Sequence, residues 1–154
     1  MRNNTLILTI VAVMTLCFMS TAQAQSGNGT VTAQDVKKET KELINSLQQY
    51  TFNQRDQALK EVDQALKKLD ERIDELQSSI DNNWDKMTQA VRKKAKSNLK
   101  ALRQQRNELA EWYGSLKNSS ADAWGEMKKG FSDAYQSMSN AWEKAKQEYD
   151  TDNK

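Results

Sequence analysis

The chain has 154 residues, of which 37% are hydrophobic and 29% charged, and its formal net charge is +2. A charge so close to balance gives no global attraction to nucleic acid or to an anionic membrane. The lack of proline and histidine, with abundant Ala, Leu, Glu, Lys, Gln and Arg, favours helix throughout and excludes histidine acid–base chemistry.

The first 24 residues have the pattern of a secretory signal peptide. A short positive start precedes an apolar run over residues 6–19 and an A-x-A cleavage site, Ala22-Gln23-Ala24. An uncleaved anchor is the weaker alternative, because the run is shorter than the about 20 residues that span a bilayer. We expect cleavage after Ala24 and a periplasmic or secreted protein. The only cysteine, Cys17, leaves with the peptide, so the mature chain has no Cys/His metal site, disulfide or thiol chemistry.

The mature chain is expected to begin with a disordered linker, residues 25–31, followed by one helical domain, residues 32–149, and a polar tail, residues 150–154. Thr32 and Asp35 have the spacing of a capping box at the start of a first, short helix. Its apolar face carries Val36, Leu43, Ile44 and Leu47. The run Tyr50-Thr51-Phe52 is a poor helix former and predicts a short break, with Asn53 as the cap of the next helix.

The clearest signal is an apolar seam in the 3.5-residue period of a coiled coil, which needs a partner face to bury it. It consists of Leu59, Val62, Leu66, Leu69, Ile73, Leu76 and Ile80. Asp81-Asn82-Asn83 then favours a hairpin turn. The apolar series resumes with Trp84, Met87, Val91, Ala95, Leu99, Leu102, Leu109, Tyr113 and Leu116. Because the pattern never breaks cleanly, an uninterrupted helix through Asn82 and a turn at residues 94–98 stay open.

Charge favours the hairpin near Asn82. Residues 57–83 contain four basic and seven acidic side chains, net −3, whereas residues 84–118 contain nine basic and three acidic, net +6. Folding the second segment back on the first places opposite charges side by side, although each exposed pair contributes only a few tenths of a kcal/mol.

A last helix is expected over residues 121–149, after breaks at Gly114 and at residues 118–120, with Ser119 and Asp122 in capping-box spacing. Its apolar stripe is aromatic and consists of Trp124, Met127, Phe131, Tyr135, Met138, Trp142, Ala145 and Tyr149. We favour core packing of this stripe, because the opposite face mixes both signs of charge. The alternative is a membrane-surface helix, in which Trp124, Phe131, Tyr135 and Trp142 form the interaction site. Gly125 and Gly130 lie off the stripe, and the sequence offers no packing reason for them.

A basic cluster, Arg92, Lys93, Lys94, Lys96 and Lys100, is the second candidate interaction site. It has the composition of a phosphate- or anionic-lipid-binding patch. An exported protein rarely meets nucleic acid, so a solvated or internally paired face is the favoured interpretation. Runs of carboxylates such as residues 70–75 are interpreted in the same way, and we expect no metal, no cofactor, no catalytic residue and no small-molecule substrate.

Four segments carry a resemblance: Tyr50-Thr51-Phe52-Asn53-Gln54, Trp84-Asp85-Lys86-Met87, Leu99 to Arg103, and Ser120 to Tyr135 with its Ala-Trp and Gly-Phe-x-x-Ala-Tyr patterns. Over residues 50–149 the chain resembles small exported coiled-coil or helical proteins of bacteria, whose function is unknown. It is also similar to a stress-response family known from cyanobacteria. The resemblance implies an all-helical protein with a loose link to stress and implies no catalytic residues.

The sequence therefore predicts an all-α protein: an antiparallel, coiled-coil-like helical hairpin with a third, aromatic amphipathic helix packed on it and a short N-terminal helix. The expected function is a non-enzymatic interaction or envelope-stress-protective role, with a protein partner or self-association. The alternative is a peripheral membrane- or envelope-binding protein that uses the last helix and the basic cluster. A holdase chaperone is a third hypothesis.

Overall fold

The computed structural model describes residues 31–152, and every regular element in this range is a helix. In chain order the elements are α1 (Ala33–Gln49), the 3₁₀ turn η1 (Phe52–Gln54), α2 (Arg55–Asn83), the 3₁₀ turn η2 (Trp84–Lys86), α3 (Gln89–Lys117) and α4 (Trp124–Asp152). The all-α prediction is confirmed. The expected signal peptide, residues 1–24, and all but the last residue of the expected linker, residues 25–31, lie outside the described residues.

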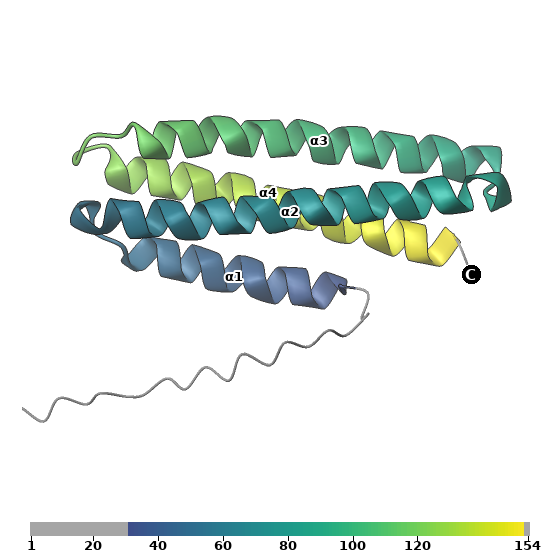
Figure 1. Cartoon of the computed structure of the whole chain (residues 1–154), viewed down its shortest axis with the longest axis horizontal. Coiled ribbons are helices and arrows are strands. Elements are labelled where there is room, and N and C mark those ends of the chain that lie inside the picture. The colour runs from purple at the N-terminus through teal and green to yellow at the C-terminus, as the bar shows by residue number, and fades with distance from the viewer. Residues whose placement is uncertain (1–30, 153–154) are drawn as a thin grey trace, which may run out of the picture.

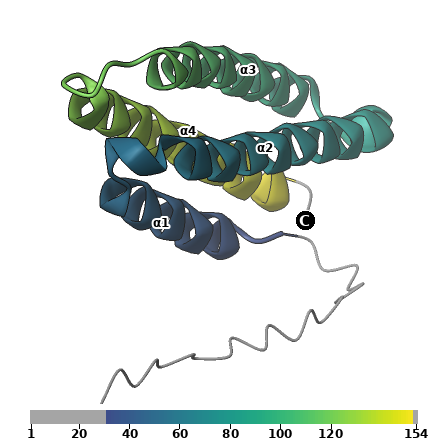
Figure 2. The same cartoon turned by 60° about the vertical axis from the view of Figure 1, so that its left-hand side comes forward.

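The four helices form an elongated bundle in which α1 is the short member (Figure 1). α1 has 17 residues, whereas α2, α3 and α4 have 29 each. The α1–α2 and α3–α4 connections lie at one end, and the α2–α3 connection lies at the other. Both views place α1 along α2 and α4, where it covers part of their length (Figure 2). The short N-terminal helix is therefore an integral fourth member of the bundle.

The start of α1 follows the predicted capping box. The backbone N–H of Thr32 donates to the Asp35 carboxylate at 3.0 Å, and the Asp35 N–H donates to the Thr32 hydroxyl at 3.2 Å. These contacts satisfy backbone donors that a helix leaves unpaired at its first turn. Hydrogen bonds from Thr32 also lower the pKa of the Asp35 carboxyl below its ordinary value.

The predicted break after α1 is confirmed, but its cap is not Asn53. Tyr50 and Thr51 have extended backbones, and the Gln54 side-chain oxygen accepts from the Thr51 N–H at 3.1 Å and from its hydroxyl at 3.0 Å. Asn53 is exposed within η1. The longer Gln54 side chain can reach back over one turn to the N–H that needs an acceptor, as in a capping box.

The C-terminal end of α1 is anchored to α4 by two donors. Lys128 Nζ donates to the Gln48 and Tyr50 carbonyl oxygens at 3.0 and 2.7 Å, and the Trp124 indole N–H donates to the Tyr50 oxygen at 3.0 Å. A cation at a helix C-terminus is favourable because unpaired carbonyls carry partial negative charge there. Burial lowers the pKa of the Lys128 ammonium.

The hairpin of α2 and α3 is confirmed, with its reversal slightly later than Asp81-Asn82-Asn83. α2 runs through Asn83, and the chain turns in η2 and at Met87, which has an extended backbone. The uninterrupted helix and the turn at residues 94–98 are therefore both wrong. The Thr88 hydroxyl accepts from the Val91 N–H and caps α3 at 3.3 Å, a signal that the asparagine-rich run obscured.

The charge complementarity of the hairpin rests on one well-formed contact. Arg106 Nε and Nη2 donate to the two Asp70 carboxylate oxygens at 2.6 and 2.7 Å. One turn away, Arg103 donates to the Gln77 side-chain oxygen at 3.1 Å. A bidentate arginine–carboxylate pair constrains orientation as well as distance, so it fixes the register of α3 on α2.

The core contains most of the predicted apolar seam. All its members are buried except Leu59, which is half-buried. Trp84, expected in the second half of the series, is also half-buried, because η2 carries it out of the helix period. α1 buries Val36 and Leu47, and the polar Thr40 takes the central place between them.

α4 begins and ends three residues later than predicted. The Ser120 hydroxyl, rather than Ser119, accepts a backbone hydrogen bond, from the Ala123 N–H at 3.3 Å. The Ser119 hydroxyl instead donates to the Leu116 carbonyl at the end of α3. The helix continues to Asp152, into the residues expected to form a polar tail.

α3 and α4 approach closely where the Trp112 indole lies over Gly130. A Cβ atom at Gly130 would lie 2.2, 2.4 and 2.8 Å from three carbons of that ring, closer than side chains tolerate. No atom lies within 4 Å of a Cβ at Gly125. Gly130 therefore has the packing role that the sequence did not reveal, and Gly125 does not.

Candidate functional site

Most of the predicted basic cluster is engaged within the bundle rather than gathered in one patch. Arg92 Nε donates to the Trp84 carbonyl oxygen at 2.9 Å, and the Arg92 guanidinium carbon lies 5.2 Å from the centre of the Trp84 ring. Lys96 Nζ lies 4.7 Å from the same ring. Cations at these distances are attracted to the face of an indole. Two of the five basic residues thus brace the α2–α3 turn.

A third member, Lys94, belongs to a contact between α3 and α4. Its Nζ lies 3.6 Å from the Glu148 carboxylate, which also accepts a hydrogen bond from Asn98 Nδ2 at 2.8 Å. The Asn98 hydrogen bond lowers the pKa of the Glu148 carboxyl, and the positive charge of Lys94 adds to the shift. This contact links α3 to the last turns of α4.

Four members of the cluster are exposed to solvent: Lys94 and Lys96, which have the contacts just described, and Lys93 and Lys100, which do not have such contacts. Neither has an ion-pair partner among residues 31–152. All four lysines of the cluster are therefore accessible from solvent, and Lys93 and Lys100 are the two that are not engaged by Trp84 or Glu148.

The four aromatic candidates on α4 lie in the core, as the core-packing interpretation predicted. Trp124 is 4% exposed, Phe131 0%, Tyr135 7% and Trp142 3%. Phe52 meets Trp124 edge-to-face at 6.2 Å between ring centres, a favourable arrangement of aromatic rings. The folded bundle does not present these rings to a membrane or a partner.

Polar groups accompany the aromatic core under α1. The Thr40 hydroxyl donates to the Val36 carbonyl oxygen at 2.7 Å and is hydrogen-bonded to Ser139 Oγ at 2.9 Å. Arg72, which is 8% exposed, donates to the Glu39 carboxylate at 2.8 Å. Nearby, burial raises the pKa of the Tyr135 phenol to about 12. The Trp142 indole nitrogen is buried and has no hydrogen-bond acceptor among the described residues.

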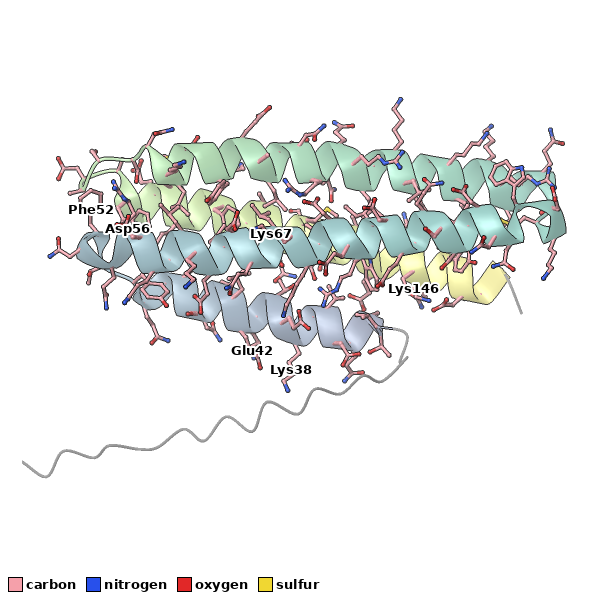
Figure 3. The ribbon with its side chains drawn as sticks, viewed as in Figure 1. Lys38, Glu42, Phe52, Asp56, Lys67 and Lys146 are labelled. Carbon is pink, nitrogen blue, oxygen red and sulfur yellow. The ribbon has the colours of Figure 1, made fainter. Side chains whose placement is uncertain are left out.

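The surface of the bundle is charged along its length, as the side chains in Figure 3 show. Lys38 and Glu42, for example, point away from the other helices on the outer side of α1, with 4.0 Å between ammonium and carboxylate. Such solvated pairs contribute little to stability and leave a hydrophilic coat.

Two hollows beside α4 are lined by residues that the structure describes. One lies between α2, α3 and α4 beside Ala95 and Ala145, and its volume of about 10 Å³ matches a single water molecule. A wider groove lies where Val31 and Ala33 meet the last turns of α4 near Lys146 and Asp150. Within the described chain, no three acidic, cysteine or histidine side chains gather in a way that could hold a metal ion.

No helix in residues 31–152 is long and apolar enough to cross a membrane. Comparison of the chain with protein-family models, with curated proteins and with solved structures found no match.

Three features of the structure were not predicted from the sequence. They are the placement of two cations on Trp84, the seating of Trp112 on Gly130, and the buried Thr40–Ser139 hydrogen bond. Trp84 is the first residue of η2 and is half-buried, so only its proximity in sequence to the basic cluster could have indicated the first feature. The other two depend on the register between helices, for which the sequence carries no local signal.

Proposed function

We propose that the chain is a non-enzymatic, exported helical protein with an interaction or envelope-stress-protective role. The observation that carries this proposal is that apolar and charged side chains occupy separate parts of the bundle. The aromatic and apolar residues pack against one another, the hollow between α2, α3 and α4 has room for one water, and the charged residues form the outer coat. A surface of this kind is suited to hydrated contacts with other macromolecules rather than to enclosing a substrate.

Deletion of the gene in its source organism, followed by survival under heat, osmotic and detergent stress, tests this role. We expect a survival defect that is restored by the complete chain and not by a chain beginning at residue 25, because export requires the leader. A deletion strain that survives every envelope stress as well as its parent would contradict the protective role. Restoration by the leaderless chain would contradict its placement outside the cytoplasm.

Attachment to an anionic envelope surface is the second candidate function, and the exposure of Lys93 and Lys100 favours it. Lys93 and Lys100 lie about two turns apart on the same side of α3. Both ammonium groups can therefore approach one layer of phosphates, and each contributes about 1 kcal/mol near an anionic membrane. The aromatic residues of α4 take no part in this candidate function, because they are buried in the core.

Co-sedimentation with anionic and with neutral vesicles tests this candidate. Charge reversal in K93E/K100E should abolish binding to anionic vesicles, whereas the matched reversal K37E/K41E on the exposed side of α1 should have a much smaller effect. Equal loss in both variants would indicate a response to net charge alone and would remove Lys93 and Lys100 as a site.

A further inference from the structure

An open hollow lies at the end of the bundle where α2 turns into α3 (Figure 1). Its volume is about 440 Å³, and it is lined by Asp81 from the last turn of α2, Trp84 and Asp85 from η2, and Lys96 from α3. Trp84 is half-buried, and the three charged side chains are exposed. The hollow therefore places an indole and both signs of charge within reach of one small molecule.

The opposite charges of the hollow do not pair with each other. Lys96 Nζ lies 4.7 Å from the centre of the Trp84 ring and forms no ion pair within the described chain. Asp81 accepts a hydrogen bond from the Gln77 amide at 2.6 Å. The Asp85 carboxylate has neither a hydrogen bond nor an ion pair among residues 31–152. The ammonium and the Asp85 carboxylate are therefore both available to a ligand that carries the two opposite charges itself.

Lys96 shares one face of α3 with the two lysines of the second candidate function. Lys93, Lys96 and Lys100 follow the spacing i, i+3 and i+7, which places them on the same side of a helix. A layer of phosphates that meets Lys93 and Lys100 would therefore bring a headgroup to the hollow as well. Trp84 agrees with this placement, because tryptophan is enriched at the headgroup level of membranes. These observations favour a lipid headgroup over a free solute as the occupant.

The contacts of the indole bear on the kind of cation that the ligand can carry. The Arg92 guanidinium carbon and Lys96 Nζ lie 5.2 and 4.7 Å from the centre of the Trp84 ring, so this ring already has two cations against it. A quaternary ammonium group is recognised mainly by aromatic faces and donates no hydrogen bond. A primary ammonium has three N–H donors, which the Asp85 and Asp81 carboxylates can accept. The hollow therefore favours a primary ammonium.

We propose that this hollow binds the headgroup of phosphatidylethanolamine, with the phosphate against Lys96 and the primary ammonium against Asp85 and Asp81. The headgroup carries its two charges on one short chain, as the opposite charges of the hollow require. Its net charge is zero, so this recognition is distinct from attraction to an anionic surface. The proposal deepens the second candidate function by naming a lipid, and it rests on the placement of this face of α3 at the envelope surface.

Co-sedimentation with vesicles tests the proposal in the chain from Gln25 onward, which contains all the described residues and lacks the apolar run at residues 6–19 that would itself bind lipid. The vesicles consist of phosphatidylcholine alone, or of equal parts of phosphatidylcholine and either phosphatidylethanolamine or phosphatidylglycerol. A hydrogen bond to a charged group changes an affinity about tenfold. We expect partition onto the phosphatidylethanolamine vesicles to exceed that onto phosphatidylcholine alone by about this factor. Equal partition onto the two would overturn the proposal.

A matched pair of variants tests the role of Asp85. D85N removes a carboxylate that has no partner in the described chain, so the fold loses no contact, and the preference for phosphatidylethanolamine should disappear. D122N makes the same change of charge at an exposed position in the α3–α4 connection, at the other end of the bundle, and should keep the preference. A preference that survives in D85N, or that D122N loses equally, would overturn the placement of the ammonium.

Two further comparisons separate this proposal from the anionic-surface candidate and from a soluble ligand. Binding to phosphatidylglycerol vesicles that K93E/K100E abolishes, without any preference for phosphatidylethanolamine, would overturn this proposal and leave the candidate function standing. A preference for phosphatidylethanolamine without binding to phosphatidylglycerol would do the reverse. Free glycerophosphoethanolamine should displace the protein from phosphatidylethanolamine vesicles. If this solute shifts the NMR signal of the Trp84 indole N–H while the vesicles retain no protein, the lipid surface as the source of the headgroup is refuted.

Discussion

The contact between Trp112 and Gly130 gives the sharpest mutational prediction. Alanine at Gly130 would place its Cβ 2.2–2.8 Å from the indole, so the ring must move. Overpacking of a well-packed contact costs about 1–3 kcal/mol, whereas replacing glycine by alanine in a helix interior stabilises by about 1 kcal/mol. Gly125 lies in the first turn of the same helix with open space around its Cβ position, so alanine there gains at most this amount. We therefore expect G130A to be less stable than G125A by about 1–3 kcal/mol.

Urea unfolding followed by circular dichroism measures the two free energies of unfolding under identical conditions. The double-mutant cycle with W112A isolates the contact, because G130A in the W112A background should stabilise the protein as G125A does. If G130A is as stabilising as G125A in the unmodified chain, the indole does not lie on Gly130, and the register of α3 on α4 is wrong.

Three further predictions concern charge, titration and capping. The Asp70–Arg106 pair should show a coupling energy of about 0.5–1 kcal/mol in a double-mutant cycle of D70N and R106Q, because both side chains are partly exposed; zero coupling would contradict the bidentate geometry. Because burial raises the pKa of Tyr135 from 10.0 to about 12 in the folded chain, its contribution to stability is complete below pH 10 and is lost between pH 10 and about 12. Y135F should remove this part of the alkaline loss of stability measured by urea unfolding, and an unchanged pH profile would refute the burial of the phenol. Removal of the cap in T32A should cost about 1 kcal/mol and expose α1 amides to hydrogen exchange, whereas unaltered exchange would contradict the capping role.

The helices could be predicted because the apolar residues of each one recur at regular short intervals along the sequence. The seam from Val62 to Ile80 and the stripe from Trp124 to Trp142 repeat every three or four residues, and all of these residues are in the core except Met127, which is half-buried. The capping box of Thr32 with Asp35 could also be predicted, because its two residues are close together in the sequence.

The exact ends of the helices were harder to predict, because several neighbouring polar residues could cap each end. Gln54 serves after α1 where Asn53 was expected, and Ser120 serves before α4 where Ser119 was expected. Neighbouring side chains have nearly equal local propensities, so tertiary contacts decide between them. The Trp124 and Lys128 hydrogen bonds to the Tyr50 carbonyl are contacts of this kind.

The structure differs most from the sequence-based prediction at the basic cluster. The sequence shows that Arg92, Lys93, Lys94, Lys96 and Lys100 are close along the chain, but it does not show which direction each side chain takes. A helix distributes five such residues around its circumference, and the structure directs Arg92 and Lys96 to Trp84 and Lys94 to Glu148. Only the neighbours in η2 and on α4 determine that Arg92, Lys94 and Lys96 have these contacts and that Lys93 and Lys100 do not.

The central claim is that the aromatic residues of α4 belong to the core and not to a binding surface. Hydrogen exchange of the tryptophan indole N–H groups, followed by NMR in the presence and absence of anionic vesicles, tests it most directly. The account predicts that Trp142 exchanges only on global unfolding, far more slowly than the half-buried Trp84, and that vesicles leave this order unchanged. Exchange of Trp142 as fast as that of Trp84, or its release by vesicles, would contradict the account.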